Sequence, residues 1–79
     1  MKESKWFLRI GDDYLEDAVC YRTKQAAVCA YREVASELHR YGQAIQATLH
    51  IAPNKDAVVE YPDYVLSMNE HGRVVTERA

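Results

Sequence analysis

Histidine and cysteine are the side chains of this sequence that could hold a metal ion or act as a nucleophile and its base. There are three histidines and two cysteines. None stands at a Cys-x-x-Cys, His-x-x-x-His or His-Glu-x-x-His spacing, the spacings that bring metal ligands together on one turn or helix face. We therefore expect no metal site and interpret the histidines as solvated surface residues. The five residues are His39, His50, His71, Cys20 and Cys29.

Covalent catalysis by a cysteine would need a histidine within hydrogen-bond reach and a third group to orient that histidine. Nothing in the sequence places either cysteine beside a histidine. The chain also lacks a glycine-rich phosphate loop, a Gly-x-Ser-x-Gly turn and paired carboxylates in an apolar context. We therefore expect no enzymatic activity, no catalytic residue and no cofactor.

Acidic residues concentrate in two stretches that contain neither lysine nor arginine. The first lies between Gly11 and Tyr21, and the second runs from Asp56 to His71. Tyrosines stand beside both stretches, and tyrosine supplies a large, rigid contact area with a polar tip. Carboxylates and tyrosine rings together suit a partner rich in arginine and lysine, through ion pairs and cation–π contacts. The residues that we predict to bind such a partner are Asp12, Asp13, Tyr14, Glu16, Asp17, Tyr61, Asp63 and Tyr64.

A simpler interpretation of these residues stays open. Four acids close together in a loop also make an ordinary solvated turn, because aspartate bonds readily to its own backbone there. The tyrosines would then only cover the edges of a small core. Either way, strands and a helix must position these loops.

One long segment, Thr23 to Gly42, has helical periodicity. Thr23 suits an N-cap because its hydroxyl can accept a hydrogen bond from a free N–H of the first turn, and Gly42 stands where a left-handed residue ends a helix. We expect Leu38 to be buried, so that its replacement by alanine costs ~2–5 kcal/mol. A stripe about 100° wide is expected to face the core. It contains Ala27, Ala30, Tyr31, Val34, Leu38 and Tyr41.

The opposite side of this helix carries a mildly basic patch around a thiol. A charged outer helix face is ordinarily solvated, and we treat this one as a secondary candidate interface, with the thiol available for an intermolecular contact. The residues of this secondary interface are Cys29, Arg32, Ser36 and Arg40.

Five short segments have the alternating pattern of strands. Asn54 can cap a short helical turn that runs through Glu60, although Val58 and Val59 would also suit a strand, so that both states stay open for this stretch. Gly72 suits the left-handed position that closes a longer hairpin loop. The expected strands are Lys5 to Ile10, Ala18 to Arg22, Ala44 to Ala52, Tyr64 to Met68 and Arg73 to Arg78.

These elements predict a single α+β domain over residues 1–79. Its sheet should be mostly antiparallel, with elements in the chain order β-β-α-β-β-β and the one helix packed on one face. Ala44 to Ala52 should be a central strand with its aliphatic side under the helix. The second face of the sheet is expected to be open, as a dimer or partner surface. Its residues would be Gln46, Thr48 and His50, joined by Phe7 and Arg9.

The charge and length of the chain exclude some functions. A net charge of −2 excludes a broadly basic nucleic-acid binder, because neutralising several phosphates takes clustered lysine and arginine. The first apolar run, Trp6 to Ile10, is too short for a signal sequence or membrane span, so we expect a cytoplasmic protein without a membrane partner. A domain of 79 residues is near the lower size for one self-sufficient core. We therefore also expect a homodimer.

Two segments, Lys5 to Ile10 (KWFLRI) and Glu60 to Ser67 (EYPDYVLS), resemble parts of small uncharacterised proteins of phages and other mobile elements of proteobacteria. Anti-CRISPR proteins form one class of such gene products. The resemblance implies action without catalysis, by binding a CRISPR effector and blocking its access to DNA, in the cytoplasm of the host cell. It assigns no role to any residue.

Two hypotheses follow from the sequence. The first is a non-enzymatic inhibitor or adaptor that binds a basic protein surface through the acidic stretches and their tyrosines, with anti-CRISPR activity as its most specific form. The alternative is a nucleic-acid-binding accessory or regulatory protein of a mobile element, which would use Arg9, Arg32 and Arg40. The sparse basic residues argue against direct nucleic-acid binding.

Overall fold

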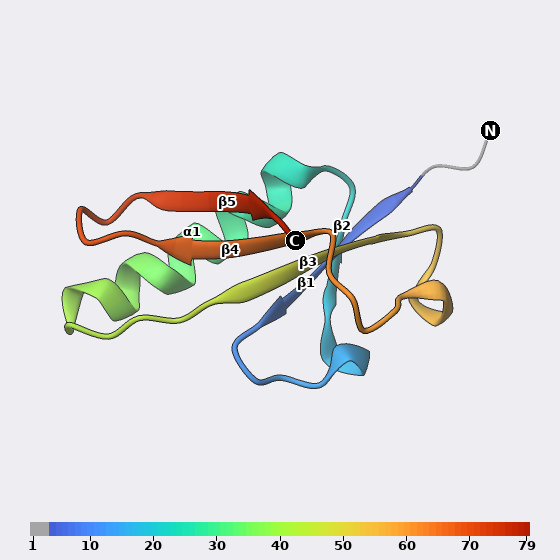
Figure 1. The fold of residues 1–79 in the computed structure, drawn as a ribbon, viewed down its shortest axis with the longest axis horizontal. Helices are drawn as coiled ribbons and strands as arrows, with labels where there is room; N and C mark the ends of the chain where they lie inside the picture. The colour runs from blue at the N-terminus through green and yellow to red at the C-terminus, as the bar shows by residue number, and fades with distance from the viewer. Residues whose placement is uncertain (1–3) are drawn as a thin grey trace.

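A computed structural model describes residues 4–79. Within them, five strands form one antiparallel sheet, one α-helix covers one of its faces, and two single turns of 3-10 helix lie in the connections (Figure 1). The elements are β1 (Lys5–Ile10), η1 (Leu15–Asp17), β2 (Val19–Tyr21), α1 (Lys24–Arg40), β3 (Ala47–Ala52), η2 (Lys55–Ala57), β4 (Tyr64–Met68) and β5 (Val74–Arg78).

The strands are arranged in the order β2-β1-β3-β4-β5, and every neighbouring pair is antiparallel. The predicted α+β class and chain order β-β-α-β-β-β are confirmed. β3 lies in the centre of the sheet as predicted, although it begins at Ala47 rather than Ala44. β2 and β5 are likewise shorter than expected, by a residue or two at their ends.

Both ends of α1 are fixed by the residues that the sequence indicates. The hydroxyl of Thr23 accepts a hydrogen bond from the N–H of Ala26 at 3.1 Å. At the other end, Gly42 has φ +73°, and the N–H of Gln43 donates to the carbonyl of Leu38 at 2.9 Å. This is a Schellman motif, which satisfies carbonyls that the end of a helix leaves free.

Replacing Gly42 with alanine is expected to lower the free energy of unfolding by about 1 kcal/mol, because a Cβ strains the left-handed conformation. A Cβ at this position would meet no atom within 4 Å, so the cost comes from the backbone alone. Urea denaturation measures it, and Gly42→Asn, which tolerates this conformation better, should lose less. An alanine variant as stable as the wild type would contradict the expectation.

The main core lies between α1 and the sheet. Leu8, Leu49 and Leu66, one from each of three adjacent strands, are buried beneath the helix. The helix contributes Ala27, Tyr31 and Ala35, all buried. Small residues on both sides of Tyr31 let the helix approach the sheet closely.

The predicted helix stripe is correct in part. Ala27 and Tyr31 are buried as expected, but Val34 is 40% exposed and Tyr41 is 72% exposed. The buried face is centred on Tyr31 and includes Ala35, which the prediction left out. The hydroxyl of Tyr31 explains this orientation, because it reaches past the core to donate a hydrogen bond to the carbonyl of Ile45 at 2.6 Å.

The second face of the sheet is not open along its whole length, which corrects the prediction for two of its residues. Phe7 is buried in a smaller cluster with Ala18, Ala52 and the partly buried Val58. His50 is 1% exposed, so its interpretation as a solvated histidine is wrong. The connections from β1 to β2 and from β3 to β4 return over this face, away from α1 (Figure 1).

The C-terminal hairpin and the turn after β3 agree with the sequence. β4 and β5 pair from Tyr64 opposite Arg78 to Met68 opposite Val74, and Gly72 has φ +76° in the loop between them. The side chain of Asn54 accepts a hydrogen bond from the N–H of Ala57 at 3.0 Å. The helical alternative is therefore correct only for Lys55–Ala57, since Val58 is already extended and the turn does not reach Glu60.

Candidate protein-binding surface

Part of the first acidic stretch and the start of the second lie side by side on the face of the sheet that faces away from α1. η1 and η2, one from each stretch, border a shallow hollow of about 280 Å³. Glu16 and Asp56 stand on its rim with Lys55, and Leu15 and Val58 form its apolar lining. Distant parts of the chain therefore form one exposed surface.

Two tyrosines stand out from this part of the molecule. Tyr14 is 74% exposed and Tyr61 is 83% exposed, so neither covers the edge of the core. Each comes from one of the two connections that carry the acids. We call the exposed acids and tyrosines of these connections the acidic surface. Its residues are Asp12, Asp13, Tyr14, Glu16, Asp17, Asp56, Glu60 and Tyr61.

Asp63 and Tyr64 are placed differently from the rest of the predicted set. A carboxylate oxygen of Asp63 accepts a hydrogen bond from the N–H of Ile51 at 2.7 Å, which ties the start of β4 to the end of β3. Tyr64 lies opposite Leu49 and therefore points to the helix side of the sheet. Asp63 thus has a structural contact, and the structure does not bring Tyr64 together with the other members of the set.

Tyr64 instead belongs to an aromatic and cationic cluster near the start of α1. Its ring lies 6.1 Å from that of Trp6, centroid to centroid. The ammonium of Lys24 lies 4.1 Å from the centroid of Tyr64, and the guanidinium of Arg78 lies 6.0 Å from it. Sequence reasoning missed this cluster, although the predicted hairpin already placed Tyr64 close to Arg78.

A polar chain of three side chains runs across β1 and β3 beneath the β3–β4 connection. The Nε of Arg9 donates to the hydroxyl of Thr48 at 3.2 Å, and that hydroxyl lies 2.9 Å from Nε2 of His50. Because Arg9 occupies one acceptor position of the hydroxyl, Thr48 can donate its proton to a neutral His50 ring. Arg9 also lies 3.8 Å from Glu60 of the acidic surface.

Burial is the main cause that lowers the pKa of His50. The positive charge of Arg9 acts in the same direction, and the carboxylate of Asp63 opposes it. The backbone of Val59 and Tyr61 also favours a proton on the ring, although Nδ1 makes no hydrogen bond within the described residues. His50 is therefore held neutral inside the fold.

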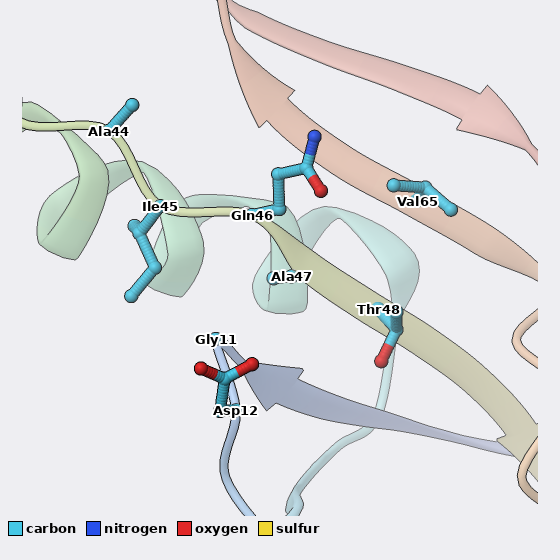
Figure 2. A pocket seen from close by; sticks show the side chains of 8 residues that line it. All are labelled: Gly11, Asp12, Ala44, Ile45, Gln46, Ala47, Thr48 and Val65. Atoms are coloured by element: carbon cyan, nitrogen blue, oxygen red, sulfur yellow. The ribbon is translucent and has the colours of Figure 1, made fainter.

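A second hollow, of about 330 Å³, opens where β1 ends and β3 begins. Figure 2 shows the carboxylate of Asp12 and the amide of Gln46 at its rim, with Thr48 and Val65 on the neighbouring strands. Asp12 is the one titratable residue of its lining. Thr48 also lines the hollow, and its hydroxyl is hydrogen-bonded to Arg9 and His50.

The secondary interface predicted on α1 does lie on one side of the helix. Cys29, Arg32 and Arg40 are exposed, and Ser36 is half-buried. Arg40 lies 3.8 Å from Glu37 in a solvent-exposed i, i+3 pair. Arg9 lies on the sheet face away from α1, so the three arginines of the nucleic-acid hypothesis do not form one patch.

Potential ligands for a metal ion are scattered over the molecule. Among residues 4–79, no group of three or more histidine, cysteine, aspartate or glutamate side chains could hold a metal ion. Cys20 and Cys29 are both exposed free thiols. In the same range, no helix has the length and apolar character needed to cross a membrane.

Comparison of the chain with protein-family models, with curated proteins and with solved structures finds no match. The assignment of a function therefore depends on the surface itself.

Proposed function

We propose that this protein is a non-enzymatic inhibitor or adaptor that binds a positively charged surface of another protein through its acidic surface, in the cytoplasm. One observation carries this proposal: the fold brings Glu16 of the first acidic stretch and Asp56 of the second together around the hollow between η1 and η2. Glu16 and Asp56 reach solvent there beside Lys55. The acids of the two connections outnumber this one lysine, and an excess of one charge speeds association with an oppositely charged partner.

The exposed tyrosines supply what carboxylates alone lack. Tyr14 and Tyr61 bury large areas at little entropic cost when a partner covers them, and their rings accept arginine and lysine side chains. Binding energy at protein interfaces concentrates in such aromatic anchors. The carboxylates speed association by long-range attraction, and the tyrosines supply contact area in the complex. This combination suits a protein partner better than a small metabolite.

The most specific form of the proposal is an anti-CRISPR protein. A CRISPR effector holds its nucleic acids in positively charged channels. A small domain with an acidic surface can occupy such a channel and exclude DNA without any chemical step. The resemblance of Lys5 to Ile10 and Glu60 to Ser67 to phage and mobile-element proteins supports this form.

Reversing three charges of the acidic surface tests the mechanism. The triple variant Asp12→Lys, Glu16→Lys and Asp56→Lys should bind a purified type I effector complex, or a lysine- and arginine-rich peptide used as a probe, roughly tenfold or more weakly than the wild type. All three side chains are exposed, so the fold should persist. Surface plasmon resonance and far-UV circular dichroism measure the two properties.

A matched control separates local contact from net charge. Glu33→Lys, Glu37→Lys and Glu70→Lys change the net charge by the same amount on exposed positions away from the acidic surface. This control should bind the effector or peptide nearly as well as the wild type. Equal loss in both triple variants, or no loss in either, would remove the acidic surface from the mechanism. Peptide binding without effector binding would remove only the anti-CRISPR form.

One observation favours nucleic-acid binding as a second candidate. Lys24 and Arg78 flank the ring of Tyr64 beside Trp6, and cations next to aromatic rings are features of single-strand binding surfaces. A gel shift at low salt with single-stranded DNA tests it, with Lys24→Glu as the weakened variant. No shift at high protein concentration would end this candidate.

A further inference from the structure

β5 is an edge strand whose outer side is unpaired in the part of the chain that the structure describes. Within residues 4–79, β5 stands last in the strand order and pairs only with β4. The N–H of Ala79 donates to the carbonyl of Asp63, and the N–H of Asn69 donates to the carbonyl of Arg73. Since hydrogen bonding alternates along an antiparallel strand, the even-numbered residues point their N–H and C=O groups outward. They are Val74, Thr76 and Arg78.

This edge lacks two of the features that usually prevent strands from pairing edge to edge. Natural sheets protect their edges with proline, bulges, charged side chains or covering segments, and of these β5 carries the charged side chains of Glu77 and Arg78. β5 contains no proline, and its five residues pair with β4 without a break in register. At the other end of the sheet, β2 has only three residues, so β5 offers the longer template for an added strand.

The outward groups limit how a second copy can pair with β5. In a two-fold antiparallel pair, the even-numbered residues of one copy must lie opposite even-numbered residues of the other, because these residues carry the outward N–H and C=O groups. Three registers meet this condition and overlap most of the strand, and each is named by the residue on its two-fold axis. Centring on Glu77 places two carboxylates opposite each other, and centring on Thr76 places Val75 against Glu77. Centring on Val75 places valine against valine and Arg73 against the Glu77 of the second copy, twice.

The register centred on Val75 is the most complementary of the three. Opposite charges directly across an antiparallel pair stabilise it, and like charges destabilise it. Val75, Arg73 and Glu77 lie on the same side of the sheet because they alternate with the outward-bonded residues. Val75 is half-buried, and Glu77 is exposed, so both are free to meet a neighbouring strand.

We propose that two copies of this chain associate through β5 into one continuous antiparallel sheet with the Val75 pair on the two-fold axis. That axis is perpendicular to the sheet, so both helices lie on one side and both acidic surfaces face the other way. β5 and the β1–β2 connection lie at opposite ends of the strand order. The dimer therefore leaves the β1–β2 part of both acidic surfaces free and does not depend on the function proposed for them.

Thr76→Pro tests the backbone pairing. Proline removes the outward N–H of Thr76, which β4 does not use, and proline is tolerated on edge strands. In sedimentation equilibrium with reductant present, the average mass of the wild type and of the control Thr76→Ala should rise toward that of a dimer from micromolar to millimolar concentration. Thr76→Pro should remain a monomer. A monomeric wild type over this range, or a Thr76→Pro variant that dimerises equally, would overturn the proposal.

A charge exchange tests the register without changing the backbone. Glu77→Arg sets two arginines opposite each other at both ends of the pair and should weaken dimerisation roughly tenfold or more. Adding Arg73→Glu restores opposite charges and should restore dimerisation. Equal weakening in the single and double variants, or none in the single variant, would overturn pairing through Val75. Both positions are exposed, and amide hydrogen exchange confirms that each variant is folded.

Discussion

Replacing Leu49 with alanine is expected to lower the free energy of unfolding by about 2–5 kcal/mol. Leu49 is completely buried. On β3 it lies opposite Leu8 of β1 and opposite Tyr64 of β4, and α1 closes the core above it. No neighbour can move into the vacated volume without disturbing the sheet, so that the cavity adds to the lost transfer free energy.

So large a loss would threaten the fold as a whole. Domains are stable by only about 5–15 kcal/mol, and small ones bury less of their surface than large ones. Thermal denaturation followed by circular dichroism should show a strongly reduced midpoint for Leu49→Ala, or no cooperative transition.

Leu38→Ala is the matched comparison. Leu38 is half-buried near the end of α1 and is not part of the main core, so its replacement should cost less than that of Leu49. The sequence pattern predicts a loss of ~2–5 kcal/mol for Leu38→Ala, and the partial exposure of Leu38 places its loss at the lower end. Equal losses for the two leucines would show that the helix end contributes as much as the centre of the sheet.

The protein is expected to lose stability as the pH falls below about 6.5, the ordinary pKa of histidine. Burial lowers the pKa of His50 in the folded state, so the unfolded chain takes up a proton at a higher pH than the folded one. Stability from this residue is complete above pH 6.5 and declines until the lower folded pKa is reached. For one proton, the decline is at most about 1.4 kcal/mol per pH unit.

The surroundings of His50 explain why the charged ring is disfavoured. It is enclosed by β1, β3 and the β3–β4 connection, with Arg9 on one side. If Nε2 of His50 were protonated, it could no longer accept the hydrogen bond that the hydroxyl of Thr48 can donate to it. Asp63 is the one carboxylate that favours the charged ring, and its Oδ2 already accepts from Ile51.

Urea denaturation over a series of pH values measures this effect. His50→Leu should flatten the decline below pH 6.5, because leucine cannot take up a proton. His71→Leu is the control, since His71 is exposed in the β4–β5 hairpin loop, and this variant should keep the wild-type profile. A profile that stays equally steep in His50→Leu would assign the acid sensitivity to other groups.

Most of the fold could be predicted from local signals. Thr23 and Gly42 mark the ends of α1 because each satisfies or shapes a helix end by itself. Gly72 and the alternation on either side of it identify the C-terminal hairpin. These features need no knowledge of distant residues.

The position of the core on α1 could not be predicted in the same way. Hydrophobic patterning favours Val34 over Ala35 because valine is larger and more apolar. The structure buries Ala35 and leaves Val34 partly exposed, because the helix comes close to the sheet on its small residues and turns so that Tyr31 reaches Ile45. Such a choice depends on packing distance, which a sequence pattern does not contain.

The burial of His50 could not be predicted either, because it depends on a contact between distant parts of the chain. Thr48 and His50 alternate with Leu49, and this pattern is typical of a strand with one solvated face. What covers His50 is a connection without periodicity, so the sequence does not reveal its path. The same path brings η2 next to η1, so the sequence indicated the acids of the candidate site but not that they form one surface.

The strand order has a consequence for how the chain reaches its structure. β1 and β3 pair along their entire length, from Lys5 opposite Ala52 to Ile10 opposite Ala47, yet β2 and α1 separate them in the chain. The loop that contains these elements must close before the centre of the sheet exists, and its closure entropy slows folding. Until β3 is added, the apolar residues of β1 and α1 lack the contacts that they make with β3 in the core. β3 pairs with both β1 and β4, so its pairing with β1 joins the N-terminal strands to the C-terminal hairpin.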